Sequence, residues 1–181
     1  MKKVLKWIGI VVGALAVVLF IAFKFVQSNT KKASPEATVN YKKDGTEVSV
    51  FYCRPSKRDR EIFGELVPYG KVWRTGANEA TTFTTNKDLT IGGKTLPAGK
   101  YTLWTIPRED KWTVIFNNKM YDWGVSFGGE ASREESADVL QVDVPVNISS
   151  IPVEKFEISF DENQPALVLE WDITRVAVPF K

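Results

Sequence analysis

The chain has 181 residues, and its charge is divided unevenly along its length. Residues 1–32 carry six lysines and no carboxylate, whereas the rest carries 18 basic against 22 acidic residues, a net charge of −4. A domain with this negative balance is poorly suited to gripping a phosphate backbone, so nucleic acid is not an expected partner. The chain has no histidine and one cysteine, which excludes Ser-His-Asp and Cys-His catalysis, imidazole metal sites and an internal disulfide.

An apolar segment near the start of the chain predicts a membrane anchor. The run 7–23 holds only residues that are apolar or glycine. As a helix it spans about 26 Å, and extending it to residues 4–26 covers a hydrocarbon core of roughly 30 Å, because Lys6 and Lys24 can reach the headgroups. A cleavable signal peptide is the alternative, although the bulky Phe23 and Phe25 do not suit a cleavage site.

We therefore expect three parts: a signal-anchor in residues 1–28, a polar tether in residues 29–36 and a single domain in residues 37–181. Short basic N-termini normally stay in the cytoplasm, so the domain is predicted on the extracytoplasmic side, periplasmic or at the cell surface. Cys53 does not lie at the end of the apolar run, where a lipid-modified cysteine would. We interpret it as a small, half-buried strand residue.

Alternation of apolar and polar residues predicts that the domain is all β. Val48, Val50 and Tyr52 share one side of a strand 47–53, and the same period recurs in 154–161 and 167–172. Gly92-Gly93 suits the type I′ turn of a two-residue hairpin, and a second hairpin is expected between 100–106 and 111–117. We expect an antiparallel β-sandwich, jelly-roll-like, with about ten strands. The segment 122–138 is predicted as a long loop with one helical turn after Ser132.

Side chains suited to binding gather in two segments. The first, 54–64, has four cations and two carboxylates; the second, 70–81, places unlike polar groups around Gly76, which permits backbone geometries that other residues resist. An arginine can hold a carboxylate or phosphate with two parallel hydrogen bonds, and an asparagine offers both a donor and an acceptor. We predict a pocket for a small polar or anionic ligand, with no cofactor and no metal. Its predicted residues are Arg60, Trp73, Arg74, Asn78 and Glu79.

Two other functions fit the same residues. If Arg60 or Arg74 pairs with Glu79, the pair holds a loop against the sandwich and needs no ligand. The domain would then be a structural or interaction module of the cell envelope. A hydrolase would instead use Glu79 with a second carboxylate, for which Glu61 is the candidate if the two loops meet.

The same segments carry a resemblance to a known family. Residues 70–81, GKVWRTGANEAT, together with Arg54-Pro55-Ser56 and Leu96-Pro97-Ala98-Gly99, resemble domain-of-unknown-function family 2911. The resemblance covers roughly residues 34–179 and implies an exported bacterial protein. It implies no particular activity. Members often have glycine where Asp59 stands here, so the charge of this loop differs.

Overall fold

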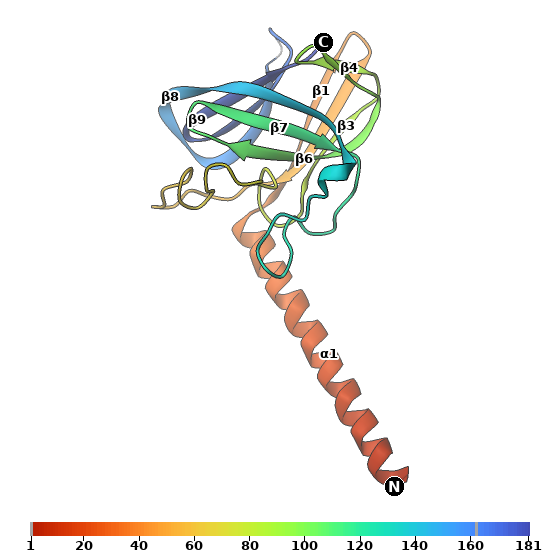
Figure 1. Cartoon of the computed structure of the whole chain (residues 1–181). Helices are drawn as coiled ribbons and strands as arrows, with labels where there is room; N and C mark the ends of the chain where they lie inside the picture. Colours follow the sequence, from red (N-terminus) through yellow and green to blue (C-terminus); the bar gives the residue numbers. More distant parts are fainter. Residues whose placement is uncertain (1, 162) are drawn as a thin grey trace. The chain divides into compact units, whose positions relative to one another are not determined.

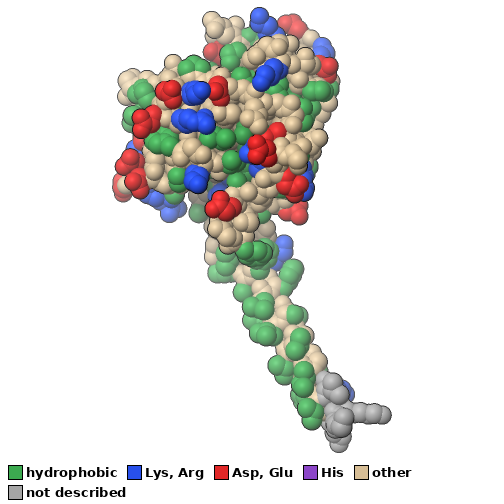
Figure 2. Space-filling model, viewed as in Figure 1, with side chains coloured by type: hydrophobic (Ala, Val, Ile, Leu, Met, Phe, Trp, Pro, Cys, Tyr) green, Lys and Arg blue, Asp and Glu red, His purple; other side chains and the backbone are tan. Residues whose placement is uncertain are grey.

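The computed structural model describes residues 2–161 and 163–181, and the chain divides into two compact units between residues 33 and 34. The first unit is helix α1 (Lys2–Ala33). From Lys6 on, this helix contains a window with a mean hydropathy of 2.6, none of it buried, and Figure 2 shows apolar side chains along its length. By length and composition α1 can serve as a membrane anchor or as a signal sequence.

Helix α1 extends further than the sequence predicted. Residues 29–33 are helical, so only Ser34 and Pro35 remain of the predicted tether before the first strand begins at Glu36. The last turn is compatible with a helix because it ends in two lysines, which interact favourably with the negative end of the helix dipole. The helix ends at Ala33 because a residue that precedes proline is biased towards extended conformations.

The second unit consists mainly of antiparallel β-structure (Figure 1). Seven strands form one sheet in the order β1-β2-β3-β6-β7-β8-β9, and β4 and β5 form a separate two-stranded sheet. The expected jelly-roll sandwich is not confirmed, because the strands of the large sheet pair with their neighbours in chain order. The elements are β1 (Glu36–Lys43), β2 (Thr46–Cys53), β3 (Thr81–Thr85), β4 (Leu89–Ile91), β5 (Lys94–Leu96), β6 (Gly99–Pro107), β7 (Lys111–Asn117), the 3-10 turn η1 (Glu135–Ala137), β8 (Asp138–Asp161) and β9 (Ala166–Pro179).

Strand β8 explains why the large sheet curls. Its first part, 138–145, pairs with β7, and its later part, 146–161, pairs with β9. The register of the β8–β9 pairing shifts twice within 148–157, and such bulges bend a strand. The chain that leaves β2 also lies along β8, since the N–H of Phe156 donates to the carbonyl of Pro55 at 2.9 Å. The two ends of the sheet therefore meet around one interior.

Aromatic rings fill part of this interior. The indole of Trp73 stacks on that of Trp171 with ring centroids 6.0 Å apart and meets Phe63, Trp112 and Phe156 edge to face. Such edge-to-face and stacked pairs stabilise a core beyond the apolar area that they bury. The tryptophans that the sequence placed in the predicted hairpins and strands are thus core residues.

The predicted inward side of β2 is confirmed. Val48, Val50 and Tyr52 are at most 1 % exposed. The hydroxyl of Tyr52 crosses the interior to β8, where it accepts a hydrogen bond from the N–H of Ile158 at 3.0 Å and donates to the carbonyl of the same residue at 3.3 Å. This side chain links the two ends of the curled sheet.

Strands β6 and β7 are buried on both faces. Trp104 of β6 and Ile115 of β7 form a second apolar cluster, separate from the main core. The loops 70–80 and 118–134 contribute to this cluster, and the ring of Tyr121 meets Trp104 edge to face at 5.4 Å. The two loops thus shield the second face of these strands from water.

Both predicted hairpins and the short helical turn are confirmed. Gly92 and Gly93 have φ angles of 56° and 76°, as a type I′ turn requires, and they join β4 to β5. Strands β6 and β7 form the second hairpin. The helical turn expected after Ser132 is η1.

Candidate functional site

The segment 73–81 pairs with β6 at both of its ends and forms a tight loop between them. Trp73 exchanges two backbone hydrogen bonds with Thr105 of β6, with N to O distances of 2.7 and 2.9 Å, and β3 begins at Thr81 on the same strand. The chain between these points bulges away from β6. Three residues of the bulge have positive φ angles: Thr75 at 56°, Gly76 at 153° and Asn78 at 58°.

Hydrogen bonds within the protein hold this loop in place. The indole N–H of Trp73 donates to the carbonyl of Gly76 at 3.1 Å, and the hydroxyl of Thr81 donates to the carbonyl of Thr75 at 2.6 Å. Thr75 also donates through its hydroxyl to Thr105 at 3.2 Å. Because buried polar groups normally have partners, these bonds account for much of the polar character of the motif without a ligand.

Gly76 brings the loop against the end of β2. A Cβ at this position would lie 2.9 Å from the carbonyl oxygen of Cys53, so a larger residue would displace the backbone. The Cys53 thiol is buried and donates to Oε2 of Glu79 at 3.4 Å. Burial, followed by the hydrogen bond to Glu79, raises the pKa of Cys53 to about 11, while Asn78 opposes the shift. A thiol in this state is a weak nucleophile.

Arg74 differs from the other polar residues of the loop. Its Nε is buried and has no hydrogen-bond partner among residues 2–161 and 163–181. The stem of the side chain lies against Gly124, where a Cβ would come within 2.2 Å of the Arg74 Cδ. Burial lowers the pKa of Arg74 below its usual value, although the nearby Cys53 opposes the shift. This direction is expected when a cation leaves water without a counter-charge.

Arg133 has a carboxylate partner for its guanidinium. It forms an ion pair with Asp138, with Nε 3.0 Å from Oδ1, and the two side chains are only 9 % and 8 % exposed. The Asn117 amide donates to the same carboxylate at 2.8 Å. Together these bonds hold the pKa of Asp138 below its ordinary value, although burial by itself would raise it. The pair fixes the end of the loop 118–134 at the start of β8.

A family model matches residues 34–180, and its description is "Protein of unknown function (DUF2911)". The chain belongs to the DUF2911 family. The match spans every strand from β1 to β9 as well as the motif segment. No curated protein and no solved structure matches the chain.

Within the DUF2911 domain, the structure brings three of the five predicted site residues together. Arg74, Asn78 and Glu79 all interact with Cys53. Trp73 is a buried core residue, 8 % exposed, and presents no open stacking surface. Arg60 is exposed and donates to carbonyls of its own loop, those of Lys57 at 3.0 Å and of Ser56.

Nothing in the sequence indicated that Cys53 and Gly124 belong to this arrangement. They lie far along the chain from Arg74 and reach it only through the pairing of β2 with β3 and through a hydrogen bond from the N–H of Gly124 to the carbonyl of Asn78 at 2.9 Å. A single cysteine in a strand and a glycine in a long loop are ordinary features. Sequence spacing alone does not connect them to the motif.

The second carboxylate of the hydrolase hypothesis, Glu61, lies near other residues. A Cβ at Gly64 would lie 4.0 Å from Oε1 of Glu61. Burial is the main reason why the pKa of Tyr69 is raised, and the charges of Glu109 and then Glu61 add to the shift. Glu79 contacts Cys53 instead. A pairing of Glu61 with Glu79 therefore remains a hypothesis.

Three cavities of the DUF2911 domain have volumes of about 800, 460 and 300 Å³. None of these three is lined by any of the five predicted residues. The one nearest the motif along the chain, about 460 Å³, lies between residues 68–72 and 129–133.

Proposed function

We propose that this DUF2911 protein is a membrane-tethered, extracytoplasmic β-domain that binds a small anionic ligand through Arg74. The observation that supports the proposal is the Nε of Arg74, which is buried and has no hydrogen-bond partner among the described residues. A carboxylate or phosphate against it would provide both the missing acceptor and the missing counter-charge. Arg74 as a whole is only half-buried, so a ligand could approach its side chain from solvent.

The remaining motif residues have supporting roles in this proposal. Trp73 and Gly76 hold the loop in its conformation through the core and through the close contact with β2. Asn78 and Glu79 lie with Arg74 around Cys53, and in this proposal they contact polar groups of the ligand beside its anionic end. Arg60 would join them only if it gave up the hydrogen bonds to its own loop.

A titration of the full-length protein in detergent tests the binding proposal. The probes are inorganic phosphate, acetate and citrate, and the measurement is the thermal shift that each produces. A ligand present at 100 times its dissociation constant stabilises the folded state by about 2.7 kcal/mol. We expect at least one anion to stabilise the wild type and the Arg58→Met control, since Arg58 is exposed, and to have no effect on Arg74→Met. If no anion stabilises the wild type, the proposal fails.

Cell fractionation tests the proposed location. The full-length chain should remain in the membrane fraction, need detergent for release and keep residues 1–28 when its mass is measured. Protease added to cells with a permeable outer surface should digest the β-domain. A mature chain without the apolar helix would show that α1 is a cleaved signal sequence.

A structural or interaction module of the envelope is the second candidate. It is favoured by the hydrogen bonds that tie Thr75, Thr81 and Trp73 to the protein itself. In that case the motif would brace the junction of β2, β3 and β6. None of the anions would shift the melting temperature, and crosslinking in intact cells would recover one specific envelope protein.

A further inference from the structure

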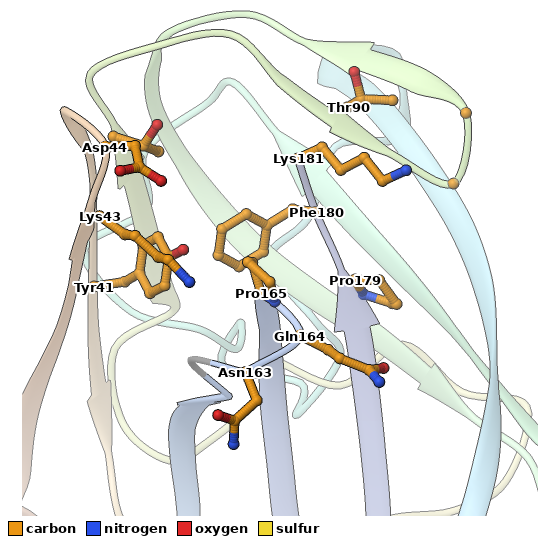
Figure 3. A pocket seen from close by; sticks show the side chains of 13 residues that line it. Tyr41, Lys43, Asp44, Thr90, Asn163, Gln164, Pro165, Pro179, Phe180 and Lys181 are labelled. Carbon is orange, nitrogen blue, oxygen red and sulfur yellow. The ribbon is translucent and has the colours of Figure 1, made fainter.

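Figure 3 shows the largest of the three cavities, about 800 Å³. It lies at the other end of β1 and β2 from the motif. Strand β1 begins opposite Cys53 and ends opposite Thr46, so the β1–β2 turn is one strand length from the motif loop. This turn, the β4–β5 turn, the β8–β9 turn and the end of β9 surround the cavity. A volume of this size is in the range typical of small-molecule sites.

Packing and backbone pairing hold the walls of this cavity in place. Thr90 and Lys181 exchange two backbone hydrogen bonds, at 2.8 and 3.1 Å, which tie the end of the chain to β4. The Tyr41 ring meets Phe180 edge to face at 5.2 Å and lies 5.5 Å from Phe160. Since these contacts need no ligand, the cavity is formed in advance, and binding would cost little ordering of the chain.

The polar groups around the cavity are mostly neutral and have spare bonding capacity. The side-chain amides of Asn163 and Gln164 and the hydroxyl of Tyr41 make no hydrogen bond with other residues that the structure describes. Among the described residues, Asn163 and Gln164 both donate their backbone N–H groups to Oδ1 of Asp161, at 2.9 and 3.3 Å. This turn leaves both side chains at the rim (Figure 3).

Charge and apolar surface narrow the class of ligand. Lys43, Asp44 and Lys181 all line the cavity, so charges of both signs surround it and do not select one kind of ion. Pro165, which lies beside the Phe180 ring in Figure 3, and Pro179 add apolar surface to the lining. A saccharide matches this combination, because its hydroxyl groups need both donors and acceptors while its C–H faces pack against apolar side chains.

We infer that the cavity formed by the β1–β2, β4–β5 and β8–β9 turns is a saccharide-binding site, separate from the proposed anion site at Arg74. The amides of Asn163 and Gln164 and the hydroxyl of Tyr41 form hydrogen bonds to the sugar hydroxyls. The rings of Pro165 and Pro179 contact the sugar C–H groups.

Isothermal titration calorimetry on the full chain tests this site, in a zwitterionic detergent because sugar-based detergents would compete. The probes are chitotriose, maltotriose and cellotriose, with inorganic phosphate as the ionic comparison. We expect at least one trisaccharide to bind the wild type. The double variant Asn163→Ala/Gln164→Ala should weaken binding by about tenfold or more, and Tyr41→Phe by about threefold, since each lost hydrogen bond contributes about 0.5–1.5 kcal/mol.

Two control variants separate this site from other effects. Asn118→Ala removes an exposed amide elsewhere, and Arg74→Met removes the proposed anion site; both should bind the trisaccharide like the wild type. The inference is overturned if none of the trisaccharides binds. It is equally overturned if the double variant binds within twofold of the wild type, or if phosphate alone binds and the double variant loses that binding.

Discussion

Replacing Arg74 by methionine should stabilise the protein, because its Nε has no hydrogen bond to lose among residues 2–161 and 163–181. Its Nε is buried without an acceptor in the described structure, while its stem packs against Gly124, a contact that a methionine also makes. A buried donor without a partner costs about 1–3 kcal/mol. Arg74 is only half-buried, so we expect the lower end of that range, a gain of about 1 kcal/mol in the free energy of unfolding.

Arg133→Met is the matched control and should have the opposite effect. Arg133 and Asp138 are almost fully buried as an ion pair, and removing one partner of such a pair leaves an uncompensated charge, which costs about 3–5 kcal/mol. The Asn117 amide still bonds to Asp138 in the variant. We therefore expect a loss near the lower end, about 3 kcal/mol.

Urea unfolding of the full chain in anion-free buffer measures both variants. Several of the six tryptophans lie in the core, so their fluorescence reports on loss of the tertiary structure. The midpoint should move to higher urea for Arg74→Met and to lower urea for Arg133→Met, without a change in the m value. If Arg74→Met loses as much stability as Arg133→Met, Arg74 has a partner in the folded protein and the reasoning is refuted.

Three further predictions concern the motif and the loop that follows it. Cys53 should resist maleimide in the native protein, because a pKa of about 11 leaves about one thiolate in a thousand near pH 8. The pKa of Asp138 is lower in the folded protein than its ordinary value of 3.8. Its contribution to stability is therefore complete above pH 3.8 and is lost as the pH falls through the pKa of the folded state. Asp138→Asn should abolish this acid dependence of the urea midpoint. Gly76→Ala should lower the free energy of unfolding in urea by at least about 2 kcal/mol, and Gly70→Ala by about 1 kcal/mol. Both glycines have a positive φ, but of the two only Gly76 would bring a Cβ against a backbone oxygen.

Each of these three predictions can fail in its own way. Rapid labelling of the native thiol would show that Cys53 is open to solvent. An unchanged acid dependence in Asp138→Asn would mean that other carboxylates carry it. Equal losses for the two glycine variants would show that backbone conformation alone, and not the contact with Cys53, decides the cost.

Features set by neighbouring residues were predictable from the sequence. The Gly92-Gly93 hairpin depends on the φ angles of two adjacent glycines, and the inward side of β2 follows from strict alternation at Val48, Val50 and Tyr52. The apolar run of α1 is equally local. The end of the helix was misplaced because the mostly polar residues 29–33 continue it, and only the proline at position 35 marks the boundary.

Features set by distant residues were not predictable. A jelly-roll and a curled meander use strands with the same alternation, and the choice depends on which partner each half of β8 finds. The burial of β6 and β7 on both faces was likewise not predictable, because it depends on the two loops that shield their second face. Alternation reveals that a strand has an apolar side, but not what covers the other side.

For the candidate site, the sequence by itself determined which side chains with useful chemistry crowd into the motif around Gly76. The tertiary structure decided which of them already have partners. Trp73 belongs to the core, and Arg60 bonds to its own loop. Arg74 has a buried Nε that donates no hydrogen bond to any described residue. The physical reason is that hydrogen bonding and burial depend on neighbours brought close by strand pairing. Residue type sets what a side chain can bind, and the fold sets what it has already bound.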